Sequence, residues 1–242
     1  MSSTTFGPKR GLQILGAFLG MQILVAAVVG IYAGYQHSLG GGATAAGGGI
    51  AIEARLTLGA ALAGTLIAGL VAARMARRSF GGPPVAIGWK GAPTGATLAA
   101  ALQGLALVAG LVIMGTVLPA PKHGLGPLAS AALAGGWTRI AWAVLAFAIA
   151  PPVEELVFRG ALYTGLANRL RPELAGGITT AIFVALHVSE IGLYWPAWIA
   201  IGALGALALR ARVRTGSLVP AIALHATYNL GLVLGVFAAT PQ

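Results

Sequence analysis

Long apolar runs separated by short polar connections make up most of this chain of 242 residues. An α-helix needs roughly 20 apolar residues to cross a hydrocarbon core of about 30 Å. No run shows the period-two alternation of a barrel strand. The pattern predicts an all-α, polytopic transmembrane helix bundle of about seven spans, with an eighth if Pro151-Pro152 divides the fourth run. The runs cover about 11–34, 56–73, 96–118, 137–165, 174–191, 196–209 and 218–238.

The composition agrees with a membrane location. Hydrophobic residues make up 57% of the chain and charged residues 8%, with a mean hydropathy of +0.87, whereas soluble domains are about 25% charged. The chain has no cysteine, which excludes disulfides, thiolate metal ligands and a thiol nucleophile. We therefore expect an integral membrane protein, and the Ala, Gly and Arg bias with short loops favours a bacterial plasma membrane.

The basic residues predict an orientation, because cytoplasmic loops carry an excess of Lys and Arg. Seven spans with a cytoplasmic N-terminus place Arg55, Lys122 and Arg139 outside and leave Arg159 within the bilayer. The net charge of +10 is then a topology signal and an attraction to anionic lipids, so nucleic-acid binding is not expected. The predicted inner side holds Lys9, Arg10, Arg74, Arg77, Arg78, Lys90, Arg169, Arg171, Arg210, Arg212 and Arg214.

Polar chemistry is confined to the second half of the chain. The first three spans carry almost no polar side chain. The sequence predicts two parts: N-terminal transmembrane helices over residues 1–128 and a second helix bundle over residues 129–242, which would hold any active site.

Two adjacent glutamates, Glu154 and Glu155, lie in a strongly apolar stretch, where a carboxylate costs roughly 2.5 to 3.5 kcal/mol. Pro151 and Pro152 are expected to interrupt the preceding helix and to place the glutamates in the first turn of a new one, where they would complement the helix dipole. Arg159 follows Glu155 by four residues and shares its face, so the two are expected to pair. Glu154 points about 140° away from Arg159 and is left for chemistry.

Two later spans carry polar residues at helical spacing. Phe183 and His187 are four residues apart, as are His225 and Asn229. At about 1.5 Å of rise per residue, Glu154, His187 and Asn229 lie at roughly 18 to 21 Å from the predicted inner boundary, and His225 at about 12 Å. We predict that the four polar residues converge on a buried aqueous pocket. The alternatives are an interfacial hydrogen bond for His187 and helix–helix contacts for His225 and Asn229.

Together, Glu154-Glu155 with Arg159, Phe183 with His187, and His225 with Asn229 resemble the EExxxR, FxxxH and HxxxN motifs of the CPBP family. That family comprises the CAAX-processing proteases, including the type II prenyl-protein endopeptidases, and bacterial (Abi-like) relatives linked to bacteriocin processing and immunity. The similarity extends roughly over residues 137–238.

The resemblance implies an intramembrane endopeptidase that acts on a peptide or membrane-protein substrate. Glu154 would be the general base that activates water, and His187 would help to hold that water. The side chains of His225 and Asn229 would donate to the oxyanion. The ion pair of Glu155 with Arg159 would fix the helix and the charge balance, although a purely helix-stabilising pair is the alternative.

Metal dependence stays open within the resemblance. Glu154, His187 and His225 could hold Zn²⁺ as a three-ligand catalytic site, but the chain lacks the His-Glu-x-x-His pattern in which a separate glutamate acts as the base. Bound zinc is therefore not required by the sequence.

Two other classes of function remain. A catalytically idle family member could serve as a membrane scaffold or a bacteriocin-immunity factor. A small proton-coupled transporter would also bury Glu, His and Asn near the midplane, but it predicts inverted repeats, and the first three spans lack matching polar residues. Substrate identity and oligomeric state are not encoded in any pattern that we recognise.

Overall fold

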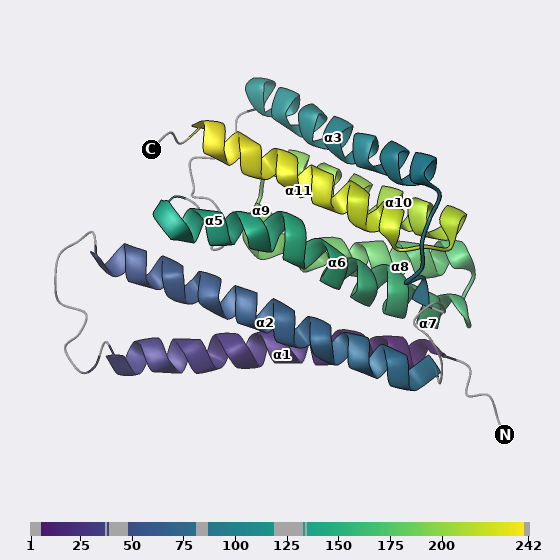
Figure 1. The fold of residues 1–242 in the computed structure, drawn as a ribbon, viewed down its shortest axis with the longest axis horizontal. Helices are drawn as coiled ribbons and strands as arrows, with labels where there is room; N and C mark the ends of the chain where they lie inside the picture. Colours follow the sequence, from purple (N-terminus) through teal and green to yellow (C-terminus); the bar gives the residue numbers. More distant parts are fainter. Residues whose placement is uncertain are drawn as a thin grey trace.

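The computed structural model describes residues 6–36, 38, 48–80, 87–118, 133 and 135–239, and within them it shows helices and no strand (Figure 1). The all-α prediction is confirmed. The helices are α1 (Pro8–Gln36), α2 (Gly48–Phe80), α3 (Thr94–Val117), α5 (Gly136–Val144), α6 (Ala150–Glu155), α7 (Tyr163–Ala167), α8 (Pro172–Ala185), α9 (Val188–Ile191), α10 (Trp195–Thr215) and α11 (Val219–Ala239), with π-helical segments η3 (Leu145–Ile149) and η4 (Leu156–Leu162).

Six helical runs in the described part of the chain are long and apolar enough to cross a membrane, and α8 is a shorter apolar helix. The direction of the chain reverses from each of these seven elements to the next (Figure 1), so the prediction of about seven spans is confirmed. The run from Gly136 to Ala167 is continuous. Pro151-Pro152 does not divide it, and the eighth span is not formed.

The expected helix break at Pro151-Pro152 is wrong for a specific reason. Proline has no N–H to donate to the preceding turn. Just before the pair, the backbone widens into the π-helical segment η3, where the N–H of Ala150 donates to the carbonyl of Leu145, five residues back. A π turn of this kind accommodates the irregularity without ending the helix. Glu154 and Glu155 therefore lie inside a long helical run and not at the start of a new helix.

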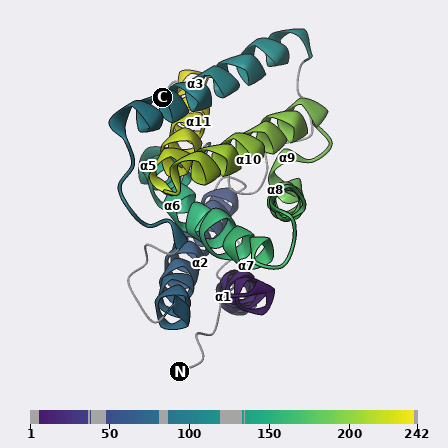
Figure 2. The ribbon, with the colours of Figure 1, turned by 90° about the vertical axis from the view of Figure 1, so that its right-hand side faces the viewer.

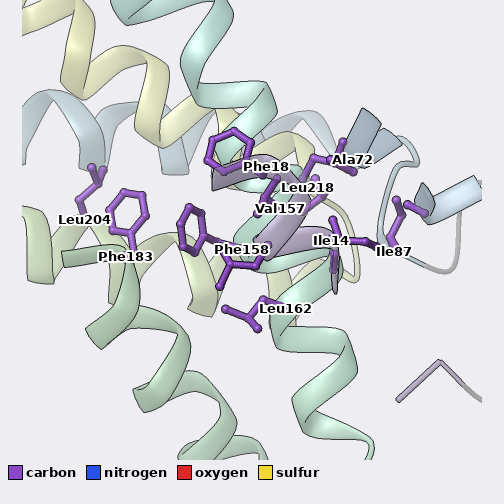
Figure 3. Close-up of a cluster of buried hydrophobic side chains, with 14 of the residues drawn as sticks. Ile14, Phe18, Ala72, Ile87, Val157, Phe158, Leu162, Phe183, Leu204 and Leu218 are labelled. Carbon is purple, nitrogen blue, oxygen red and sulfur yellow. The ribbon is translucent and has the colours of Figure 1, made fainter. Parts of the chain in front are cut away.

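The elements pack in layers around the continuous run from α5 to α7 (Figure 2). On one side α1 and α2 pack against each other and against η4, while on the other side α11 lies between the run and α3. The largest core cluster joins side chains of α1, η4 and α8 (Figure 3), including Ile14, Phe18, Val157, Phe158 and Phe183. The predicted boundary between residues 128 and 129 lies outside the described residues, and the division into two parts stays a prediction.

A close approach of backbones holds α1 on the central run. A Cβ added at Gly11 would lie 3.0 Å from the carbonyl oxygen of Ala161, and one added at Gly165 would lie 3.0 Å from the carbonyl oxygen of Gly7. Small residues at such crossings allow the van der Waals contact that drives helix association in lipid. This contact holds α1 against η4 and α7.

Most of the described basic residues gather at one end of the bundle. Asn168 donates to the carbonyl of Phe6, and the hydroxyl of Ser217 donates to the carbonyl of Lys90, so the start of α1, the segment before α3 and the α7–α8 and α10–α11 junctions meet at this end (Figure 1). Arg55 and Arg139 lie near the starts of α2 and α5, at the opposite end. Lys122 lies outside the described residues, and the cytoplasmic assignment of the basic end stays a prediction.

Candidate active site

The expected pair between Glu155 and Arg159 is confirmed as a buried ion pair. Nη1 of Arg159 donates to Oε1 of Glu155 over 3.0 Å, and both side chains are at most 1% exposed. Nη2 of Arg159 donates to the backbone carbonyl of Gly205 on α10 over 3.1 Å. The guanidinium also lies 4.3 Å from the centre of the Phe183 ring, a cation–π contact. Helix α10, which carries none of the motif residues, thus helps to hold the arginine.

Glu154 faces both histidines. Its Oε2 lies 3.9 Å from Nε2 of His187 and 3.9 Å from Nε2 of His225. These distances exceed a direct hydrogen bond, and Oε2 is buried without a hydrogen-bond partner within the described part of the chain. Polar atoms at such a separation can be connected through a water molecule instead of a direct bond. The predicted convergence of Glu154, His187 and His225 is confirmed, but His187 lies in the turn between α8 and α9 and not within a helix.

The other ring nitrogen of each histidine has a fixed partner. Nδ1 of His187 lies 2.7 Å from the carbonyl oxygen of Phe183, and Nδ1 of His225 lies 3.0 Å from Oε1 of Glu155. A carbonyl oxygen or a carboxylate only accepts, so in each ring Nδ1 carries the proton. In the neutral form each Nε2 then presents a lone pair toward Glu154. The partner of Nδ1 thus decides which ring nitrogen carries the proton and leaves the other nitrogen, Nε2, as the hydrogen-bond acceptor.

Burial within the site is graded. The side chains of Glu154 and His187 are 20% and 26% exposed, whereas His225 is 2% exposed. Helix α8 has 14 residues, or about 21 Å, which is shorter than a core of about 30 Å. His187 lies two residues beyond its last residue, Ala185. Non-helical backbone at membrane depth is tolerated only inside protein or beside a water-filled cavity, and the side of the site that carries Glu154 and His187 is its more exposed side.

Asn229 makes a side-chain hydrogen bond to the backbone of the glutamate-bearing run. It lies one turn after His225 on α11, and its Nδ2 donates to the carbonyl of Ala146 in η3 over 2.8 Å. This is the helix–helix contact that the sequence left as an alternative to an oxyanion contact. Five of the six predicted site residues therefore lie in one cluster: Glu154, Glu155, Arg159, His187 and His225. The sixth, Asn229, is bonded to the helical run that carries the two glutamates.

Comparison with known proteins covers this region. Residues 136–231 match a protein-family model described as "Type II CAAX prenyl endopeptidase Rce1-like". This segment is an Rce1-like domain. The match bears out the resemblance to the CPBP family, contains all six predicted site residues and supports an intramembrane protease. No curated protein and no solved structure matches the chain.

The Rce1-like domain can be tested for a zinc site by the spacing of its donors. Two imidazoles and a carboxylate are suitable zinc ligands, and bonds of about 2.0 to 2.1 Å in tetrahedral geometry place neighbouring donor atoms about 3.4 Å apart. Here Oε2 of Glu154 lies 3.9 Å from each Nε2. Among the described residues, no three His, Cys, Asp or Glu side chains are arranged to hold a metal ion. As placed, the donor atoms are more widely spaced than the ligands of a tetrahedral zinc ion.

Sequence reasoning missed three features of the Rce1-like domain. The π-helical segments η3 and η4 flank the glutamates, and π segments occur frequently at functional sites. Pro151-Pro152 indicated an irregularity in the helix but did not show that the irregularity is a π-helical segment. The carbonyls of Gly205 and Ala146 are backbone acceptors, which leave no mark in the sequence.

Proposed function

We propose that the chain is an intramembrane endopeptidase in which Glu154 activates a water molecule for attack on a peptide carbonyl. The observation that carries the proposal is the buried Oε2 of Glu154, which has no hydrogen-bond partner among the described side chains and faces Nε2 of both histidines. Glu154 also lies inside the segment that matches an endopeptidase family, which supports peptide-bond hydrolysis as the reaction.

Attack begins with a water held between Oε2 of Glu154 and Nε2 of His187. Both groups accept hydrogen bonds, so the two protons of the water are directed at them and its oxygen lone pair is left for the substrate. Glu154 takes one proton as the hydroxyl oxygen bonds to the carbonyl carbon, and the electron pair of the C=O bond moves to the oxygen. A positioned general base contributes about 10²- to 10⁴-fold.

The oxyanion formed in this step needs a donor. Nε2 of His225 can donate to the oxyanion only when the ring carries a proton on both nitrogens, since Nδ1–H stays on Glu155; donors aimed at developing charge are most effective in such a site. Arg159 balances the charge of Glu155. Collapse of the tetrahedral intermediate then breaks the C–N bond, and the proton held by Glu154 passes to the leaving amine.

The substrate that we propose is a peptide or the terminus of a membrane protein that enters from the lipid-facing side of Glu154 and His187. The family description names a CAAX prenyl endopeptidase, so a prenylated C-terminal peptide is one substrate class to include. We further propose that the protein lies in a bacterial plasma membrane with its basic end toward the cytoplasm.

The test is cleavage of a peptide library by the detergent-purified protein, with products identified by mass spectrometry. The library should contain internal peptides and C-terminal peptides with and without a prenylated cysteine. We expect discrete products with the wild type and none with Glu154→Gln. An absence of products with the folded wild type across all peptide classes would contradict the proposal and favour a scaffold, an immunity factor or a transporter.

A further inference from the structure

The π-helical segment before the glutamates is followed by Pro151 and Pro152, so carbonyls of η3 lack the backbone donors that residues 151 and 152 would supply. In η3 the N–H of Ala150 donates to the carbonyl of Leu145, five residues back. The next carbonyl in this register belongs to Ala146, and its donor would be residue 151. Residue 151 is proline, which has no N–H. Within an apolar membrane interior, an unsatisfied carbonyl is strongly disfavoured.

A side chain from another helix supplies the missing donor. Nδ2 of Asn229, on α11, donates to the carbonyl oxygen of Ala146 over 2.8 Å. The amide of Asn229 thus takes the place of the N–H that Pro151 lacks. One turn earlier on the same helix, Nδ1 of His225 bonds to Oε1 of Glu155.

Helix α11 is therefore bonded to the glutamate-bearing run at two levels. The bond from Asn229 holds the backbone of η3. The bond from His225 holds Glu155, the last residue of α6. Glu154 lies between these two attachment points, in the short segment Ala150–Glu155. The two bonds, one on each side of Glu154 in the sequence, constrain the rotation of this segment relative to Nε2 of His225.

We propose that Asn229 is a positioning residue that replaces the missing N–H of Pro151 and thereby sets the direction in which Glu154 points. In this role Asn229 acts through the backbone of η3 and does not contact the reacting carbonyl. The expected effect of Asn229 on peptide cleavage rests on the proposed function. Its expected effect on the stability of the protein does not.

The test uses the complementarity between the proline and the asparagine. Asn229→Ala removes the amide, and Pro151→Ala restores a backbone N–H that can reach Ala146. The double variant Pro151→Ala/Asn229→Ala should therefore recover what Asn229→Ala loses. The matched control is Pro152→Ala/Asn229→Ala, because an N–H at residue 152 faces the carbonyl of Phe147 or Ala148 and not that of Ala146. Melting temperature in detergent, kcat and KM are measured for each variant.

We expect Asn229→Ala to lower the melting temperature and to lower kcat by about 10- to 100-fold, as for a displaced catalytic group, with KM within about twofold of the wild type. Pro151→Ala should restore both quantities, and Pro152→Ala should restore neither. If Asn229→Ala does not yield folded protein, we expect the Pro151→Ala/Asn229→Ala variant to fold and the Pro152→Ala/Asn229→Ala variant not to fold.

Two results would overturn the proposal. A kcat that stays low in the Pro151→Ala/Asn229→Ala variant at wild-type melting temperature would show that the amide acts on the substrate. Equal melting temperatures for the wild type and Asn229→Ala would show that the bond to Ala146 stabilises nothing. The melting temperatures decide the second point even if no peptide is ever cleaved, so failure of this inference is separable from failure of the proposed protease activity.

Discussion

Nδ1 of His225 lies 3.0 Å from Oε1 of Glu155, the same oxygen that accepts a hydrogen bond from Nη1 of Arg159. One carboxylate oxygen thus joins two other helical elements of the site: α11 through the histidine and, through Arg159, the carbonyl of Gly205 on α10. Its neighbour Glu154 makes no such bond, and its Oε2 faces two imidazoles at 3.9 Å. The two adjacent glutamates therefore have different surroundings, and we propose that they have different roles.

The two glutamates should differ first in their effect on stability. Glu155→Gln leaves the buried guanidinium of Arg159 without its counter-charge, and breaking a buried pair in this way costs about 3 to 5 kcal/mol. Glu154→Gln removes no hydrogen bond between described residues and should therefore cost far less free energy of unfolding than Glu155→Gln. Denaturant unfolding of both variants in the same detergent checks the difference. Equal destabilisation would show that Glu154 also has a structural partner.

Gly205 should resist substitution although it lies far from the motifs in sequence. A Cβ at this position would lie 2.9 Å from Cγ2 of Thr180 and 3.2 Å from Nη2 of Arg159. Gly205→Ala should therefore cost about 1 to 3 kcal/mol through overpacking and should reduce peptide cleavage by displacing the arginine.

The matched control lies one turn earlier on α10. A Cβ at Gly202 would meet no atom within 4 Å, so Gly202→Ala should be neutral or should stabilise the helix by up to about 1 kcal/mol. Melting temperature and cleavage rate are compared for the two variants. Wild-type behaviour of Gly205→Ala would mean that its contact with Arg159 is dispensable.

His187→Phe tests whether this histidine acts through Nε2. The ring of His187 packs on Phe183 with centroids 4.5 Å apart, and phenylalanine preserves this packing while it removes both nitrogens. We expect kcat to fall by about 10²- to 10⁴-fold, because the water loses one acceptor, while the protein still folds. Ser189→Ala, two residues away on α9, is the control for a role at the membrane interface and should keep wild-type cleavage. Unchanged kcat in His187→Phe would assign the histidine to packing alone.

The hydrophobic pattern was sufficient to predict the fold class and the composition of the site cluster. Apolar runs of membrane-spanning length leave few choices other than helices, and polar residues are so scarce in them that Glu154, His187 and His225 had few alternative partners. Spacing of four residues also predicted the ion pair of Glu155 with Arg159, because that spacing places two side chains on one face of a helix.

The features that escaped prediction are those set by backbone atoms of other helices. Whether Pro151 breaks a helix or is absorbed by a π turn depends on a donor for the carbonyl of Ala146, and that donor, Asn229, comes from a helix some 80 residues later. The role of Gly205 depends on its carbonyl and on the space beside Arg159. Neither contact follows from the residue type, so sequence periodicity could not reveal it.

The measurement that tests the central claim most directly is the rate of peptide cleavage by wild type and Glu154→Gln, each with and without a strong zinc chelator. If Glu154 activates water without a metal, the wild type keeps its rate in chelator, and Glu154→Gln loses at least about 10²-fold in both conditions. Loss of wild-type activity in chelator, with recovery when zinc is added back, would contradict the account. So would a Glu154→Gln variant that cleaves at the wild-type rate.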